Sequence, residues 1–220
     1  YELGWKYNSE KFFFNSNLYY MGYKNQLVLT GALDDVGSPI RENSGKSYRT
    51  GIELESVYKA TNKLNISANI SFSENKNVDY KTNYNGVITD WGDTDISFSP
   101  NVISSAGIQF SASQDLTLTF LNKFVGNQYM SNTESNISKL SSYSTTDLNI
   151  LYTIKNSAYF SEIIVTAMIN NIFNKEYVSN GYYYTYDDTW SDPNLITTIE
   201  GTGYYPQAKR NFLLGLTFKL

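Results

Sequence analysis

The side chains that most often carry enzyme chemistry are missing from this sequence of 220 residues. It contains no histidine and no cysteine. Without histidine, neither the usual general base nor the usual partner of a catalytic serine can be assembled from this chain. Without cysteine, there are no disulfides and no thiolate ligands for a metal. We therefore predict no catalytic residue, no cofactor and no metal centre, and a protein that is not an enzyme.

Carboxylates are the main reactive groups that are present, and they gather in three polar stretches. The clusters are Asp34 with Asp35, Asp90 with Asp93 and Asp95, and Asp187 with Asp188. Such oxygen ligands can bind Ca²⁺, but their spacing matches no EF-hand loop. The alternative, which we expect, is that these acidic loops are simply solvated.

Glu53 and Glu55 form a different kind of pair, because they lie two residues apart in a segment of alternating polarity. Side chains at such spacing share one face of a strand. They could line a cation path or act together as a carboxylate pair. We expect instead that both are hydrated residues of a wall facing water.

Aromatic side chains are concentrated in the segment GYYYTYDDTW, residues 181–190. Such side chains bury a large area at low entropic cost, which suits ligand capture. The predicted substrate-binding set is Tyr182, Tyr183, Tyr184, Tyr186, Trp190 and, from an earlier polar stretch, Trp91. Within it, we expect Tyr183, Tyr184 and Tyr186 to form the contact surface and Trp190 to be the buried anchor. The alternative is a loop that packs on itself or joins an aromatic girdle at a membrane interface.

The final stretch of the chain indicates which elements position these groups. One parity is apolar (Phe212, Leu214, Leu216, Phe218 and Leu220), and the other is mostly polar (Asn211, Gly215, Thr217 and Lys219). This alternation predicts a β-strand with one apolar face. In a soluble protein it would be an exposed, aggregation-prone edge. A closed barrel in lipid removes the edge and leaves the apolar face facing acyl chains.

Similar alternation recurs along the chain and predicts an all-β protein. The predicted strands are residues 1–7, 12–29, 48–58, 64–73, 102–112, 116–129, 143–155, 163–169 and 210–220. Short turns at 8–10, 61–63, 113–115 and 156–161 alternate with long polar loops at 30–46, 74–100, 130–142 and 174–206. Short turns on one rim and long loops on the other are typical of antiparallel transmembrane β-barrels of the outer membrane. A soluble sandwich would distribute its loop lengths more evenly.

The number of predicted strands, about nine, is odd, whereas single-chain bacterial barrels have an even number. The chain also begins in mid-pattern, without a start methionine or a signal segment. We therefore expect residues 1–220 to be the C-terminal part of a larger barrel. The net charge of −4 and the lack of a basic stripe argue against a nucleic-acid partner.

Three segments resemble the C-terminal barrel of TonB-dependent outer-membrane receptors. They are GNQY (126–129), NNIFNKEY (170–177) and YYPQAKRNFLLGLTF (204–218). In that family, a segment similar to the second ends the penultimate strand, and one similar to the third opens the last strand. The sequence departs from the family at its terminus, which is Leu220 instead of the common aromatic residue.

The resemblance implies a 22-stranded barrel whose lumen holds a plug, since barrels of that size are too wide for their own side chains to fill. The plug and the N-terminal strands would precede Tyr1. The implied function is ligand-gated active import across the outer membrane of a scarce nutrient such as a ferric siderophore, haem or cobalamin. The implied partners are membrane lipid, the TonB–ExbB–ExbD complex and a small-molecule ligand such as a metal chelate. A glycan or peptide importer of the SusC type, working with a surface lipoprotein, and a passive porin or structural barrel are the alternatives.

Overall fold

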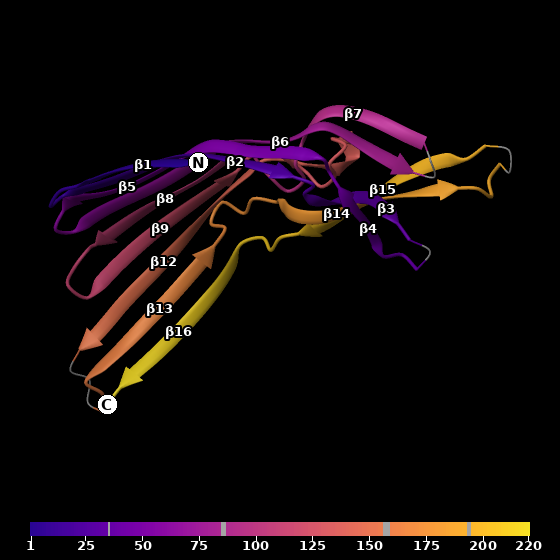
Figure 1. Ribbon diagram of the computed structural model, residues 1–220. Coiled ribbons are helices and arrows are strands. Elements are labelled where there is room, and N and C mark those ends of the chain that lie inside the picture. Colours follow the sequence, from indigo (N-terminus) through magenta and orange to yellow (C-terminus); the bar gives the residue numbers. More distant parts are fainter. Residues whose placement is uncertain (35, 85–86, 156–158, 193–194) are drawn as a thin grey trace.

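The computed structural model describes residues 1–34, 36–84, 87–155, 159–192 and 195–220. Its main feature is a curved antiparallel sheet, the wall, from which three hairpins project at one end (Figure 1). The wall strands are, in spatial order, β1 (Glu2–Asn8), β2 (Phe12–Lys24), β5 (Lys46–Thr61), β6 (Leu64–Tyr84), β8 (Val102–Ser111), β9 (Leu116–Val125), β12 (Tyr143–Lys155), β13 (Glu162–Asn170) and β16 (Asn211–Lys219). Their spatial order follows the sequence, so the predicted all-β fold and its nine wall strands are confirmed.

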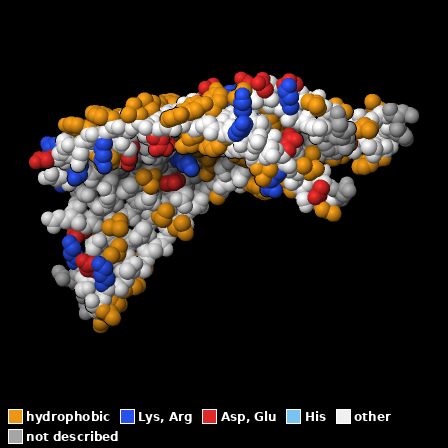
Figure 2. Space-filling model, in the orientation of Figure 1, with side chains coloured by type: hydrophobic (Ala, Val, Ile, Leu, Met, Phe, Trp, Pro, Cys, Tyr) orange, Lys and Arg blue, Asp and Glu red, His pale blue; other side chains and the backbone are white. Residues whose placement is uncertain are grey.

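Alternating residues give the wall two different faces. Ile70 pairs with Leu54 on one side and with Ser104 on the other, while its neighbour Asn69 pairs with Glu55 and Ser105. Hydrophobic side chains gather along the outer edge of the wall over β1, β2 and β5 (Figure 2). A wall face of this kind needs no protein cover in lipid.

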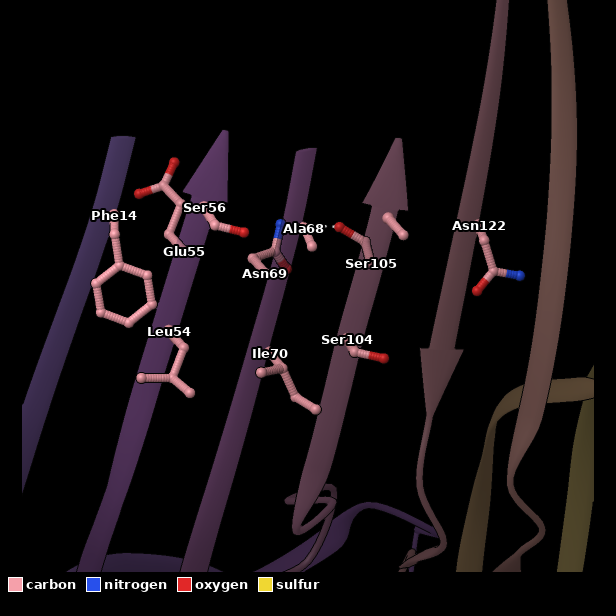
Figure 3. A pocket seen from close by; sticks show the side chains of 11 residues that line it. Phe14, Leu54, Glu55, Ser56, Ala68, Asn69, Ile70, Ser104, Ser105 and Asn122 are labelled. Carbon is pink, nitrogen blue, oxygen red and sulfur yellow. Dashed lines mark hydrogen bonds between the residues drawn. The ribbon is translucent and has the colours of Figure 1, made fainter. Parts of the chain in front are cut away.

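A pocket of about 380 Å³ lies along the wall strands β2, β5, β6, β8 and β9, and Figure 3 shows the side chains around it. Asn69 Nδ2 donates a hydrogen bond of 2.8 Å to Ser105 Oγ across the pair β6–β8. Glu55, the neighbour of Asn69 on β5, lies on the same polar face. This agrees with the expectation that Glu55 is part of a polar wall surface.

Three of the four segments that we predicted as long polar loops, 30–46, 74–100 and 174–206, are largely strands, so the prediction was wrong for them. The fourth, 130–142, is mostly loop, with one short 3-10 helix and a two-residue strand. Beyond the wall lie β3 (Leu27–Leu33), β4 (Pro39–Asn43), β7 (Val87–Asp95), β14 (Val178–Asp188) and β15 (Thr197–Pro206). Three shorter elements accompany them: β10 (Gln128–Tyr129), the 3-10 helix η1 (Asn136–Ser138) and β11 (Lys139–Leu140). Because these hairpins project beyond the wall, they lack its regular apolar face. Their polar composition therefore made them look like loops.

Two further boundaries differ from the prediction. The predicted strand 12–29 is interrupted after Lys24, where Asn25 adopts a left-handed conformation with φ of 56°. Asparagine tolerates this region better than most residues, which allows the chain to turn from β2 into β3. β6 runs on to Tyr84 instead of ending near residue 73, and its far half pairs with β7.

The most buried side chains lie among the hairpins. Asn132, which is 1 % exposed, joins three segments through its amide. Its Nδ2 donates to the carbonyl of Leu29 at 3.0 Å, and its Oδ1 accepts from the backbone N–H of Ser97 at 2.9 Å and from Asn77 at 3.3 Å. Buried amides that are fully bonded fix the relative position of the elements that they join. Among the described residues, no helix is long and apolar enough to cross a membrane.

Candidate ligand-binding site

A cavity of about 580 Å³ lies between the three hairpins. Its walls come from β3, β4, the far halves of β6 and β7, β14, β15 and the segment before η1. The lining residues are Thr30, Ala32, Ile40, Glu42, Thr82, Asn83, Thr89, Trp91, Thr133, Tyr183, Thr185, Tyr186, Asp187, Thr198 and Glu200. Its size falls in the range of small-molecule sites, and it combines aromatic rings with converging polar groups.

Strand pairing brings distant parts of the sequence together at this cavity. β14 pairs with β15 on one side, and on the other side Thr185 pairs in parallel with Ala32 of β3. The sheet order is therefore β15-β14-β3-β4. Hairpins separated by more than 130 residues in sequence thus form one surface, which the alternation pattern of either segment alone could not reveal.

Tyr183 lies on the face of β14 that lines the cavity. Its hydroxyl donates a hydrogen bond of 2.6 Å to Glu200 Oε1, and Ser135 Oγ donates one of 2.9 Å to Glu200 Oε2. Burial raises the pKa of Tyr183, and the nearby carboxylate of Glu200 raises it further. The ring packs over Gly31, where a Cβ would lie 2.7 Å from Tyr183 Cε1 and φ is +90°. This close approach favours glycine at position 31.

Trp91 lines the cavity from the opposite hairpin. It belongs to β7, its ring is 42 % exposed, and its Nε1 donates a hydrogen bond of 3.0 Å to Thr82 Oγ1. The bond fixes the polar edge of the indole on its own hairpin. The remaining ring surface is therefore available to a ligand.

Strand alternation separates the predicted tyrosines, because Tyr182, Tyr184 and Tyr186 lie on the opposite face of β14 from Tyr183. They form a ladder with ring centroids 6.2 Å and 6.4 Å apart. The rings of Tyr182 and Tyr184 pass over Gly203 and Gly201, where a Cβ would collide with them. Tyr183 and Tyr186 nevertheless both line the cavity, and Tyr184 is not among its described lining residues. A contact surface made of Tyr183, Tyr184 and Tyr186 therefore stays a prediction.

Trp190 is not a buried anchor. Its side chain is 72 % exposed and stacks on Tyr186 with ring centroids 6.4 Å apart. It follows the end of β14, where Asp188 Oδ1 accepts hydrogen bonds from the backbone of Trp190 and Ser191. The aromatic ladder thus packs partly on itself, as the alternative interpretation of this segment expected.

The described aspartates of the acidic clusters form ion pairs or hydrogen bonds with nearby residues. Asp95 forms a 2.7 Å ion pair with Lys76, and Asp90 forms one of 2.9 Å with Lys81 that lowers the pKa of Asp90. Asp93 accepts from the backbone N–H of Asp79, and Asp34 caps the turn to Ser38. Asp35 lies outside the described residues. Over the described part of the chain, no three acidic side chains come together in a group that could hold a metal ion.

Several lining residues were not recognised from the sequence. Glu42, Glu200 and the threonines at 30, 82 and 198 face the cavity, although no motif marks them. Their positions depend on which hairpins meet, and a local pattern carries no information about that. The threonines in these segments were the available signal that the segments are strands, because β-branched residues favour strands over loops.

A family model described as the β-barrel of TonB-dependent receptor-like proteins matches residues 1–172. The chain belongs to the TonB-dependent receptor family. The resemblance noted in the sequence is thereby confirmed, and the wall described above is part of that family's barrel. No curated protein sequence matches the chain.

Solved structures of this family share its fold. The siderophore receptor PiuA from Acinetobacter baumannii superposes with a TM-score of 0.70 at 17 % identity, over 98 % of this chain and 27 % of that one. The ferric-catecholate import receptor Fiu from E. coli K12 gives 0.66 at 16 % identity, over 97 % and 26 %. The copper transporter OprC gives 0.67 at 17 % identity, over 99 % and 30 %. The chain therefore spans between a quarter and a third of the length of these three proteins.

Proposed function

We propose that residues 1–220 form the C-terminal part of the barrel of an outer-membrane receptor, which captures a scarce nutrient and imports it with energy supplied through TonB, ExbB and ExbD. Membership of the TonB-dependent receptor family supports this function. The observation that carries it is the cavity between the hairpins, at the end of the wall opposite the short turns. In barrels of this type, the longer connections face the outside of the cell.

The geometry suits a capture step better than a chemical reaction. The lining offers aromatic surface from Trp91, Tyr183 and Tyr186, together with threonine hydroxyls and carboxylates. These groups bind and orient a ligand. A plug and the remaining strands, which we propose to lie upstream of Tyr1, would pass the ligand through the lumen. Siderophore receptors and a copper transporter among the similar structures make a metal chelate the first ligand class to test.

Uptake by living cells tests this proposal. Cells with and without the gene are grown under metal limitation, and accumulation of radiolabelled iron is measured with ferric chelates of the hydroxamate and catecholate classes and with haem. The same measurement is made in a matched strain that lacks ExbB. We expect accumulation that requires both the gene and ExbB. Accumulation that needs the gene but not ExbB would contradict energised import and favour a passive porin.

A further inference from the structure

The cavity between the hairpins carries negative charge. Glu42, Asp187 and Glu200 line it, and the described residues of its lining include no lysine or arginine that would offset this charge. The neighbouring lysines on β6 are engaged elsewhere, since Lys81 pairs with Asp90 and Lys76 pairs with Asp95.

The hydrogen bonds of these carboxylates hold them in place without neutralising them. Glu200 accepts from the hydroxyls of Tyr183 and Ser135, and Asp187 Oδ1 accepts from Thr198 Oγ1 at 2.9 Å. All three donors are uncharged. None of the three cavity carboxylates takes part in an ion pair with another described residue. An anion that entered the cavity would therefore meet like charge, and this repulsion is stronger where water is partly excluded.

Aromatic surface accompanies the carboxylates. Trp91 and Tyr186 lie on different hairpins and are 42 % and 40 % exposed. Aromatic faces attract cations, and tryptophan does so most strongly. Carboxylates and aromatic faces in one cavity discriminate in the same direction, since both favour a positive charge.

We infer that this cavity takes a small organic ligand that carries a positive charge on a flat or apolar body, and that it rejects anionic ligands of similar size. The inference rests on the proposed function for the role of the cavity in capture, and it adds the charge class of the ligand. Among the ferric chelates of the uptake experiment, cationic hydroxamates should therefore be taken up in preference to anionic catecholates. Threonine side chains from five strands add polar surface to the cavity.

A pair of fluorescent xanthene dyes of similar size, one cationic and one anionic, provides the test. Binding to the protein, purified in detergent as the cell produces it, is followed by fluorescence polarisation at low ionic strength. We expect the cationic dye to bind about tenfold more tightly than the anionic dye. Added salt should reduce the difference, because it screens the partly exposed carboxylates.

Charge-neutral variants locate the effect. Asp187→Asn should weaken the preference for the cationic dye, and Glu42→Gln combined with Asp187→Asn should remove most of it. Asp188→Asn is the matched control for Asp187→Asn, because it removes the same charge from the next residue, which is not among the described residues that line the cavity. It should leave the preference unchanged. Circular dichroism and heat-modifiable migration in SDS gels verify that each variant is folded.

The inference is overturned if the anionic dye binds as tightly as the cationic one, if neither dye shows saturable binding, or if D188N has the same effect as D187N. These outcomes are separate from those of the uptake experiment. A cation preference in a protein whose uptake does not need ExbB would support the ligand class and contradict energised import. Energised uptake by a protein that shows no cation preference would support energised import and contradict the ligand class.

Discussion

Tyr183 links the two strands of the β14–β15 hairpin through Glu200, and its ring packs over Gly31 of β3. Its hydroxyl and that of Ser135 share the carboxylate of Glu200. Tyr183→Phe removes one donor while keeping the ring over Gly31. A hydrogen bond to a charged group contributes about 1.5–3 kcal/mol, and the partial exposure of Glu200 places this one near the lower end. We expect faster amide hydrogen exchange in β14 and β15 of this variant.

Tyr182→Phe is the control for that change, since Tyr182 lies on the opposite face of β14 and is 50 % exposed. It should leave exchange in the hairpin close to that of the unmodified protein. Equal protection in the Tyr183→Phe variant and the unmodified protein would contradict the role of the Tyr183–Glu200 bond.

Glu42 provides a pH-dependent prediction for the cationic dye. Burial raises the pKa of its carboxyl, and hydrogen bonds with Tyr80 and the backbone of Asn83 offset part of this increase. The carboxyl attracts a cation only when ionised. Dye affinity should therefore fall, as the pH is lowered, at a higher pH than an ordinary glutamate would produce. In polarisation titrations, Glu42→Gln should remove this fall in affinity. If the fall is unchanged in the variant, another group is responsible for it.

Single residues also show what the sequence can and cannot predict. The density of aromatic residues in 181–190 identified a segment that does line the cavity. It could not assign Tyr183 to one face and Tyr182, Tyr184 and Tyr186 to the other, because that requires knowing that the segment is a strand. Glu42 and Glu200 belong to the site only because β3 meets β14, which is a long-range contact that no local pattern encodes.

At the scale of elements, β6 allows a direct test of the two wall faces. Ile70→Lys places a charge on the face that we assign to lipid, at a cost of about 2–4 kcal/mol near the middle of the bilayer. Asn69→Lys places the same charge one residue away on the polar face, where water can solvate it. We expect much less folded protein in outer membranes for Ile70→Lys, measured by heat-modifiable migration, and near-normal levels for Asn69→Lys. Equal losses would show that the faces are wrongly assigned.

The wall strands were predictable because burial on one face and exposure on the other impose an alternation with period two. β8 and β12 lie within two residues of their predicted bounds. The hairpins were not predictable in this way, because both of their faces carry polar or aromatic residues and their pairing depends on backbone hydrogen bonds. The interruption after Lys24 depends on one left-handed asparagine and leaves little trace in the alternation.

At the scale of the whole molecule, β1 and β16 are edges of the described sheet, each paired on one side only. Unpaired edges in lipid leave backbone groups without hydrogen-bond partners. If further strands close the barrel, residues 1–220 expressed alone should refold into detergent as aggregates and not as an SDS-resistant monomer. Size-exclusion chromatography and gel migration provide the measurement. A monodisperse, protease-resistant monomer would contradict the proposal that this chain is part of a larger barrel.

We propose that the wall spans the outer membrane with the hairpins and their cavity outside the cell. The absence of cysteine from these 220 residues makes single-cysteine labelling within them straightforward. Thr198→Cys on the β14–β15 hairpin and Ser113→Cys in the turn before β9 are treated, in intact cells, with a thiol reagent that cannot cross the outer membrane. We predict labelling at position 198 in intact cells and at position 113 only after the membrane is permeabilised. Labelling of position 113 but not position 198 in intact cells, or of both equally, would contradict this orientation in the membrane.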